Sequence, residues 1–355
     1  MADLLREALE RLLDRQELTR AEARALLGAI FADVGDAAAT PARDAQIAGI
    51  LAALATKGET VDEIVGFAEA MRAAVADIGL RGKSPSWVDL CGTGGRARNI
   101  FNISTVASFA VAGAGLAVAK HGNRSSTSVC GSADVLDAAG VNLSFPAERL
   151  GSCLLSTGIV FLYAPLLHPA MRRVMPARRA LQVRTVFNLL GPLTNPAGAG
   201  SQVLGVPFAP LVPKLAQALL ALGTTHSFVV YSEDGLGEFS TTALNQVAEI
   251  RDNRVHQFLL DARDLGLPRV PASALACRSR EEALAALQRV LAGEAGPHAD
   301  IVALNAAAAL RAGGLASDWA EGLAMARAAL ASGAAQQKLE ALVQFTAAGQ
   351  TARAR

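Results

Sequence analysis

The stretch Trp87-Val88-Asp89-Leu90-Cys91-Gly92-Thr93-Gly94-Gly95 decides the fold of this chain. Its apolar run, Trp87 to Cys91, predicts a buried strand, and the glycines that follow predict a tight loop. An apolar helix is expected next, with Ser104 or Thr105 as its N-cap, and then a second strand from Leu116 to Ala119. A strand, a glycine loop, a helix and a strand in this order indicate a unit of parallel sheet.

Short apolar strands continue to alternate with helical segments along the chain. The further strands are predicted at Ile159 to Leu162, Val203 to Val206 and Phe228 to Tyr231, and a hairpin is predicted from Gln246 to Ile250 and Val255 to Leu260. Helices are expected from Glu281 to Phe345. The alternation predicts an α/β fold, in which a mainly parallel central sheet is covered by helices.

The first part of the chain has a different pattern. Residues 4–75 carry apolar side chains at helical spacing and predict four helices. Thr19 with Glu22 and Thr60 with Glu63 have the spacing of capping boxes, and Gly58 is placed to end a helix from Asp44 to Thr56. We therefore expect a small N-terminal helical subdomain at 1–79 and a larger α/β domain at 80–355.

Composition limits the environment and the partners of the protein. The 355 residues carry a formal net charge of +1 with both signs interspersed, so neither a nucleic-acid partner nor a membrane partner is expected. The four cysteines contain no Cys-x-x-Cys pair, which suits a reducing compartment and argues against structural zinc. The N-terminus has no basic region followed by an unbroken apolar core, so we expect a cytoplasmic protein without a secretory signal.

Three polar stretches stand at the ends of the first predicted strands and the first helix. They are Gly92-Thr93-Gly94-Gly95, Asn102-Ile103-Ser104-Thr105 and Lys120-His121-Gly122-Asn123-Arg124. The free amides of a helix N-terminus attract phosphate oxygens, and a Lys-His-Gly-Asn-Arg cluster at a strand end is hard to explain by packing alone. Each stretch is weak by itself, but together they predict a site for a phosphorylated sugar.

The order and spacing of these stretches resemble the anthranilate phosphoribosyltransferase family. The family's pattern continues with Gly131-Ser132-Ala133-Asp134 and with the stretch Phe187-Asn188-Leu189-Leu190-Gly191-Pro192-Leu193-Thr194-Asn195-Pro196. The resemblance implies transfer of a phosphoribosyl group from phosphoribosyl diphosphate to the amine of anthranilate, with loss of diphosphate, in tryptophan biosynthesis. It also implies magnesium, a homodimer, and helices from about 165–185 that join the N-terminal subdomain in space.

The resemblance further implies which residues bind each substrate, with no protein nucleophile and no catalytic residue beyond positioning and electrostatics. The implied donor-binding residues are Gly92, Thr93, Gly94, Gly95, Asn102, Ser104, Thr105, Lys120, Arg124 and Ser132. The implied acceptor-binding residues are Gly92, His121, Asn123, His168, Arg178, Gly191 and Pro192, with Arg178 facing the anthranilate carboxylate. Ser104 and Glu238 are the implied magnesium ligands. For His121, a hydrogen-bonded role beside the sheet is an equal alternative, and Arg179 is expected on a solvated helix face.

Three departures from the family's pattern fall where the family handles diphosphate and metal. Arg96 and Gly237 each stand in place of an aspartate, and Val129 stands in place of a basic residue. The change at Gly237, beside Glu238, leaves open whether one or two magnesium ions bind. Together the three changes make the site more positive by two units, the charge of one magnesium ion, so Arg96 is a candidate substitute for the second metal.

Other functions stay open at this point. One is a diverged paralogue that uses another aromatic acceptor or another donor, and a second is a catalytically silent homologue that binds nucleotides or nucleic acid. The neutral charge and the retained Lys120, Asn123, Arg124 and Arg178 weigh against the second. A dinucleotide-binding dehydrogenase is disfavoured, because Gly92 to Arg96 does not complete a Gly-x-Gly-x-x-Gly spacing.

Overall fold

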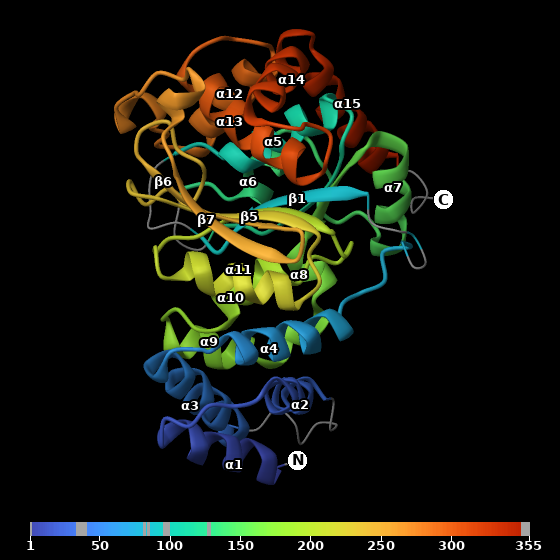
Figure 1. The fold of residues 1–355 in the computed structure, drawn as a ribbon. Coiled ribbons are helices and arrows are strands. Elements are labelled where there is room, and N and C mark those ends of the chain that lie inside the picture. Colours follow the sequence, from blue (N-terminus) through green and yellow to red (C-terminus); the bar gives the residue numbers. More distant parts are fainter. Residues whose placement is uncertain are drawn as a thin grey trace. The chain divides into compact units, whose positions relative to one another are not determined.

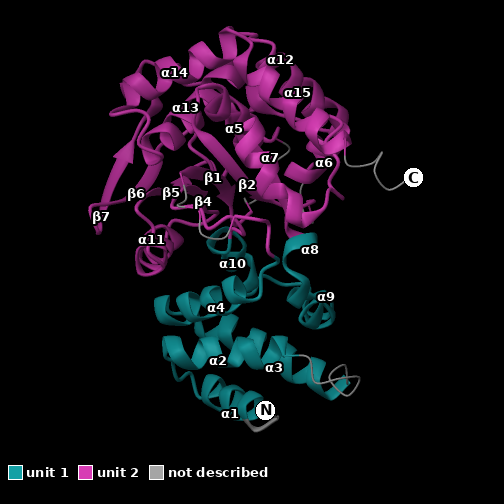
Figure 2. Ribbon diagram, turned by 90° about the vertical axis from the view of Figure 1, so that its right-hand side faces the viewer, with its two compact units in different colours: residues 1–76, 165–194 teal, residues 77–164, 195–355 magenta. Residues whose placement is uncertain are grey.

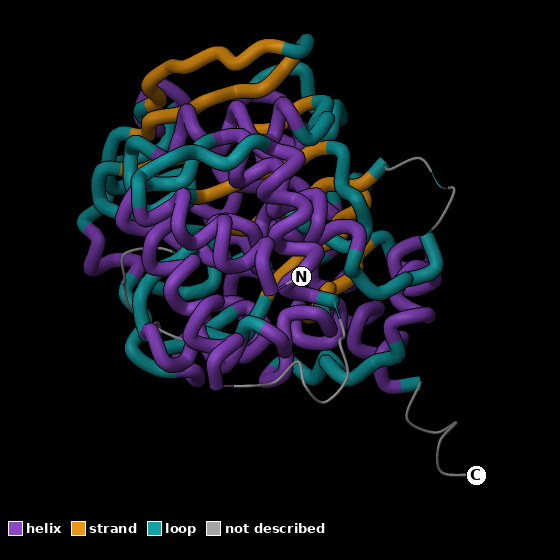
Figure 3. The backbone as a smooth tube through the Cα atoms, turned by 90° about the horizontal axis from the view of Figure 1, so that it is seen from below, coloured by secondary structure: helices purple, strands orange, loops and turns teal. Residues whose placement is uncertain are grey.

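The chain divides into two compact units. A computed structural model describes residues 2–32, 41–80, 83, 86–94, 100–125 and 129–348. Unit 1 comprises residues 1–76 and 165–194, and unit 2 comprises residues 77–164 and 195–355 (Figure 2). The described backbone is mostly helical, and its named strands all belong to one sheet in unit 2 (Figure 3). None of the described helices combines the length and the apolarity that a bilayer-spanning segment needs.

Unit 1 is helical throughout its described part. Its elements are α1 (Ala2–Leu13), α2 (Arg20–Phe31), α3 (Pro41–Lys57) and α4 (Val61–Ala73), followed much later by α8 (Ala164–Leu167), η3 (Pro169–Arg173), α9 (Met175–Leu181) and α10 (Phe187–Leu193). Helix α9 packs on α3, η3 on α2, and α10 on α4. The four helices predicted for residues 4–75 are confirmed, although α3 begins at Pro41 rather than at Asp44. Gly58, with a φ of 85°, follows its last turn as predicted.

Both predicted capping boxes are present, but only one of them is buried. Glu63 Oε2 accepts a hydrogen bond from Thr60 N at 2.8 Å, and Thr60 Oγ1 accepts one from Glu63 N at 3.2 Å. The fully buried Glu63 also pairs with Lys57 Nζ at 2.9 Å and accepts from Leu18 N at 2.9 Å. In the other box, Glu22 is 42% exposed and pairs with an exposed Arg11. Glu63 therefore joins α3, α4 and the segment that precedes α2.

The sheet of unit 2 has seven strands in the order β3-β2-β1-β4-β5-β6-β7. They are β1 (Trp87–Gly92), β2 (Ala117–Gly122), β3 (Ile159–Tyr163), β4 (Ser201–Gly205), β5 (His226–Ser232), β6 (Asn245–Arg251) and β7 (Arg254–Leu260). Strands β1 to β5 are parallel, while β6 and β7 form the predicted antiparallel hairpin. Its turn residues, Asp252 and Asn253, adopt the left-handed conformation that such turns require. The predicted α/β fold with a mainly parallel sheet is confirmed.

Helices cover both faces of this sheet. They are α5 (Ile103–Gly113), α6 (Ser132–Ala138), α7 (Leu150–Thr157), α11 (Leu211–Ala221), α12 (Arg280–Leu291), α13 (Pro297–Ala312), α14 (Trp319–Ala331) and α15 (Ala334–Ala347), with short turns η2 (Ala147–Arg149), η4 (Ala262–Leu265) and η5 (Ala272–Leu275). Figure 1 shows α5 and α12 to α15 on one face and α11 on the other. Helix α5 packs against α13, α14 and α15 as well as the sheet, so it is apolar on nearly every side.

Two local predictions are wrong. Asn102, not Ser104 or Thr105, is the N-cap of α5, because Ile103 is already helical and places both hydroxyl residues in the first turn. Strand β2 runs on to Gly122 instead of ending at Ala119, because it stays paired with β3 as far as Gly122↔Tyr163. Lys120 and His121 therefore lie within a strand rather than in a loop after it.

The two capping boxes allow a matched test of burial in unit 1. Glu63→Ala leaves Lys57 as a buried and unpaired charge, and we expect it to lower the free energy of unfolding by about 3–5 kcal/mol. The control Glu22→Ala removes the same group from an exposed box and is expected to cost about 1 kcal/mol or less. Urea denaturation followed by circular dichroism measures both changes. Equal losses would contradict the structural role given to Glu63.

Candidate functional site

The carboxyl ends of the parallel strands bring several predicted donor-binding residues together. Gly92 ends β1, and Thr93 N donates to Gly205 O at the end of β4, at 3.0 Å. A Cβ on Gly205 would overlap Gly237 O, at 1.6 Å, so only glycine allows the loop after β5 to cross this close to β4. This close approach carries the neighbouring Glu238 to the same edge of the sheet.

Lys120, Ser104 and Glu238 form a cluster of side chains in unit 2. Lys120 Nζ donates to Leu90 O at 2.5 Å and to Ser104 Oγ at 3.2 Å. The Glu238 carboxylate accepts hydrogen bonds from the hydroxyl and the backbone amide of Ser104. Desolvation raises the pKa of Glu238 to about 7, while the charge of Lys120 and the bonds from Ser104 act in the opposite direction. The cluster thus joins residues from β2, α5 and the loop after β5.

The cluster has the chemistry of a magnesium site that depends on its substrate. Magnesium prefers oxygen ligands, and the hydroxyl of Ser104 and the carboxylate of Glu238 supply them. Over the described ranges no group of three or more histidine, cysteine or acidic side chains could hold a metal ion. Gly237 has no side chain to offer. The residues therefore fit an ion that takes its remaining ligands from water and from substrate phosphates.

The loop after β2 is held by acidic side chains of α6. Arg124 pairs with Asp134 at 2.8 Å and with Asp137 at 3.1 Å, and these carboxylates raise the pKa of its guanidinium. Asp134 also accepts from Ser125 N at 3.1 Å and from Gly131 N at 2.9 Å, while Ser132 Oγ donates to Asn123 O at 3.2 Å. A phosphate contact of Arg124 would have to share the guanidinium with these two carboxylates.

Thr105 and Asn102 are not part of the hydrogen-bonded cluster, although Thr105 shares a small void with Lys120, and Gly95 lies outside the described residues. The side chain of Thr105 lines a void of about 10 Å³ between α5 and the sheet, and Asn102 Nδ2 donates to Cys130 O at 3.0 Å. Val129 is 44% exposed. Gly94 follows Thr93 with a φ of 84°, whereas Gly95 and Arg96 lie outside the described residues.

The predicted acceptor residues are divided between the two units. Gly92, His121 and Asn123 belong to unit 2, whereas His168, Arg178, Gly191 and Pro192 belong to unit 1. The guanidinium of Arg178 lies over the ring of Phe187, with Cζ 5.5 Å from the ring centre. Among the described residues, no carboxylate pairs with it, and burial lowers its pKa. A half-buried arginine without an acidic partner among the described residues is suited to bind a carboxylate through two parallel hydrogen bonds.

Two polar residues without an assigned role stand beside this cluster. Asp89 Oδ1 accepts from His121 N at 3.1 Å, and Asn195 Nδ2 donates to Asp89 Oδ2 at 2.8 Å. The sequence does carry a signal for Asp89, since a charged residue within the apolar run Trp87 to Cys91 has to find a partner once it is buried. Asn195 lies in the signature stretch Phe187 to Pro196, but its role could not be predicted, because its partners Asp89 and Ala119 are distant in sequence.

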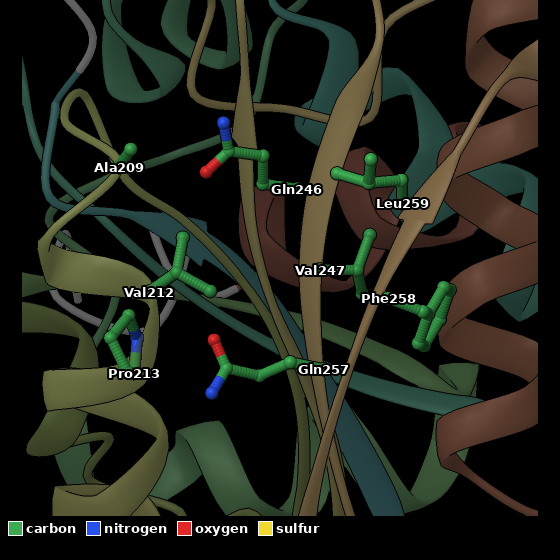
Figure 4. A pocket seen from close by; sticks show the side chains of 8 residues that line it. All are labelled: Ala209, Val212, Pro213, Gln246, Val247, Gln257, Phe258 and Leu259. Atoms are coloured by element: carbon green, nitrogen blue, oxygen red, sulfur yellow. The ribbon is translucent and has the colours of Figure 1, made fainter.

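A separate groove of about 250 Å³ lies between α11 and the β6–β7 hairpin. Figure 4 shows Gln246 and Gln257 pointing toward Val212 and Pro213 of α11. Its lining residues carry no titratable side chain. It therefore lacks the charged groups that the cluster around Lys120 offers to a phosphorylated ligand.

Comparisons with known proteins cover almost the whole chain. Residues 84–336 match the model of a glycosyl transferase family, a/b domain, and residues 6–75 match that of a glycosyl transferase family, helical bundle domain. The anthranilate phosphoribosyltransferase of Desulforamulus reducens is 46% identical over 343 residues, which are 97% of each chain. That of Anaeromyxobacter dehalogenans is 47% identical and covers 97% of this chain and 99% of its own.

Solved structures show the same similarity. The anthranilate phosphoribosyltransferase of Thermus thermophilus superposes with a TM-score of 0.87 at 41% identity, over 96% of this chain and 99% of its own. The enzyme of Saccharomyces cerevisiae in complex with PRPP and Mg superposes with a TM-score of 0.86 at 26% identity, over 97% and 98%. The likeness therefore includes the helical unit as well as the sheet.

The buried His168 makes unit 1 sensitive to acid. Burial lowers its pKa to about 4, so between that value and the ordinary pKa the unfolded chain binds a proton that the folded chain does not. Its contribution to stability is therefore present above about pH 6.5 and is lost as the pH falls, by about 2 kcal/mol between pH 7 and pH 5. Urea unfolding at both pH values should show this loss in the wild type and much less of it in His168→Gln. The exposed His256 provides the control, and His256→Gln should keep the wild-type dependence.

Proposed function

Because the chain belongs to the anthranilate phosphoribosyltransferase family, we propose that it transfers the phosphoribosyl group of phosphoribosyl diphosphate to anthranilate in tryptophan biosynthesis. The observation that carries the proposal is the 46% identity to curated members of this family over 97% of the chain. The cluster of Lys120, Ser104 and Glu238 adds chemistry suited to a diphosphate with its metal. The direct test is release of diphosphate from phosphoribosyl diphosphate, with and without anthranilate and magnesium.

The reaction needs charge and position rather than a protein nucleophile. As the bond to diphosphate breaks, the C1 carbon of the ribose gains positive character and the leaving group gains negative charge. Lys120 Nζ lies 3.2 Å from Ser104 Oγ and supplies a cation to the diphosphate. Magnesium, held by Ser104 and Glu238, would neutralise further phosphate charge when it is bound. One ion accounts for these ligands, and Gly237 offers nothing to a second.

The acceptor has to present its amine in line with the departing diphosphate. Arg178 binds the anthranilate carboxylate, because its guanidinium is half-buried and no acid pairs with it among the described residues. His168 is uncharged at neutral pH, since burial lowers its pKa to about 4, and it leaves the carboxylate to Arg178. His121, Asn123, Gly191 and Pro192 complete the proposed acceptor contacts.

The assembly and location of the enzyme form part of the same proposal. We propose a cytoplasmic homodimer that associates through the N-terminal helices of unit 1. Leu13 at the end of α1 is 66% exposed, which is the apolar surface that such an interface would cover. Light scattering of the purified protein measures the mass of the assembly.

A diverged paralogue is the second candidate. The replacement of two aspartates and a basic residue by Arg96, Gly237 and Val129 favours it, because all three positions belong to the donor side of the site in the family's pattern. Turnover measured with a panel of aromatic amines distinguishes the candidates. Faster turnover with another amine than with anthranilate would favour the paralogue.

The role of Arg178 can be tested against its neighbour. Arg178→Ala removes a charge-assisted bond confined to the acceptor, so kcat/KM for anthranilate should fall by about 1.5–3 kcal/mol, roughly 10- to 150-fold. The KM for phosphoribosyl diphosphate should stay nearly constant. Arg179→Ala is the control, because Arg179 is exposed on the same helix. Equal weakening of donor and acceptor by Arg178→Ala would refute the assignment.

Arg96 is proposed to stand in for a second magnesium ion. Arg96→Asp alone should then reduce turnover, because it removes a guanidinium that pairs with the diphosphate. Adding Gly237→Asp should recover turnover with a steeper magnesium requirement. Gly237 has a φ of 67°, a left-handed conformation that asparagine and aspartate tolerate equally well. Gly237→Asn is therefore the control: it introduces the same backbone strain as Gly237→Asp but no carboxylate. Unchanged or higher turnover in Arg96→Asp would show that Arg96 does not replace a metal.

A further inference from the structure

The backbone ladder between β1 and β2 ends before the strands reach the site. Their ladder has only two pairs, Trp87↔Ala117 and Val88↔Val118. On its other side, β1 stays paired with β4 as far as Gly92↔Gly205, and β2 stays paired with β3 as far as Gly122↔Tyr163. The parallel sheet is therefore continuous on both sides of a split that opens toward its carboxyl edge.

Side chains take over the hydrogen bonds that the split leaves unmade. Asp89 Oδ1 accepts from the amide of His121 at 3.1 Å, and Asn195 Nδ2 donates to the carbonyl of Ala119 at 2.8 Å. From the opposite strand, Lys120 Nζ donates to the carbonyl of Leu90 at 2.5 Å. Buried backbone groups need such partners, so these three side chains replace a ladder that would otherwise close the split.

Asp89 and Asn195 also bind each other. Asn195 Nδ2 donates to Asp89 Oδ2 at 2.8 Å, and Asn195 Oδ1 accepts from Ala197 N at 2.8 Å. Asp89 is fully buried and Asn195 is 9% exposed. Each polar atom of the two side chains thus has a named partner within unit 2. Asn195 is also the residue at which the chain enters unit 2 after the segment 165–194.

A buried carboxylate at this position has an electrostatic consequence. Burial raises the pKa of Asp89, whereas the charge of Lys120 and the hydrogen bonds from Asn195 and His121 oppose that rise. Lys120 and Asp89 therefore favour each other's charged forms in a region from which water is excluded. Removal of the Lys120 charge would leave Asp89 with its hydrogen bonds alone, whereas Lys120 without Asp89 would keep the nearby charge of Glu238.

We propose that Asp89 and Asn195 are positioning residues, which hold β1 and β2 apart and fix Lys120 and His121 at the site. Neither has to touch the substrate. The consequence for the donor rests on the proposed function, because it concerns the diphosphate that Lys120 is proposed to bind. Asp89 binds the backbone amide of His121 and favours the charged form of Lys120, while Asn195 binds the carbonyl of Ala119, which precedes Lys120.

A purely structural role is the alternative. In that case, loss of the pair would lower stability without a selective effect on either substrate. Glu249 on β6 provides the matched control, because it is another buried carboxylate of unit 2, hydrogen-bonded to His226 and paired with Arg311. Glu249→Gln, like Asp89→Asn, replaces a buried carboxylate by an amide, but Glu249 has no proposed contact with the site.

The test compares Asp89→Asn, Asn195→Ala and Glu249→Gln by two methods. Hydrogen exchange of the peptide 116–125 should accelerate about 10-fold or more at the His121 amide in Asp89→Asn, and not in Glu249→Gln. Calorimetric titration with magnesium phosphoribosyl diphosphate should show about 10- to 100-fold weaker binding in Asp89→Asn and Asn195→Ala. Because His121 is also a proposed acceptor contact, the KM for anthranilate should rise in Asp89→Asn as well, and it should stay within about 2-fold of the wild type in Glu249→Gln.

Each outcome decides between the two roles. Unchanged donor affinity in both variants, with thermal stability lowered as in Glu249→Gln, would overturn the positioning role. If Asp89→Asn does not fold, Asn195→Ala provides the same comparison. A wild-type protein that binds no phosphoribosyl diphosphate would contradict the proposed function instead. The exchange rate of His121 in the variants would then decide whether the pair holds the split, since that measurement needs no substrate.

Discussion

The burial of Asp89 and Lys120 in neighbouring strands is the constraint on which the centre of unit 2 depends. An aspartate and a lysine deep in a sheet are costly unless each charge is compensated and each polar atom is bonded. Here the compensation requires β1 and β2 to separate, because the carboxylate bonds to the backbone of β2 and the ammonium bonds to the backbone of β1. The buried hydrogen bonds of Asp89 and Lys120 therefore determine how β1 and β2 lie at the carboxyl edge of the sheet.

The same constraint links the strand ends to the groups proposed to bind diphosphate and magnesium. Lys120 reaches Ser104 on α5, and Ser104 bonds to Glu238 in the loop after β5. That loop reaches the edge because Gly205 has no side chain to keep Gly237 away. A lysine and a glutamate therefore lie within one hydrogen-bonded group. Desolvation lowers the pKa of Lys120 and raises the pKa of Glu238, so it favours the uncharged form of each side chain.

Local patterns predict much of the fold, and the misplaced end of β2 shows where they fail. Thr60 with Glu63, Gly58, and the hairpin around Asp252 and Asn253 follow rules that act within a few residues, and all are present as predicted. The predicted end of β2 comes too early because Lys120 and His121 are polar, and polarity is usually a sign that a strand has ended. Both residues continue the strand because their partners, Asp89, Leu90 and Phe161, come from other strands.

By itself, the sequence determined the family, the α/β class and the identity of the motifs, because these depend on residue order and on short-range periodicity. It could not assign a role to Asn195, whose bonds to Asp89 and Ala119 join residues that are far apart along the chain. Nor could it predict that Arg124 is paired with Asp134 and Asp137, or that Arg178 lies over Phe187 without an acidic partner among the described residues. Tertiary structure decided these points, because hydrogen bonds and desolvation depend on distances that only the folded chain creates.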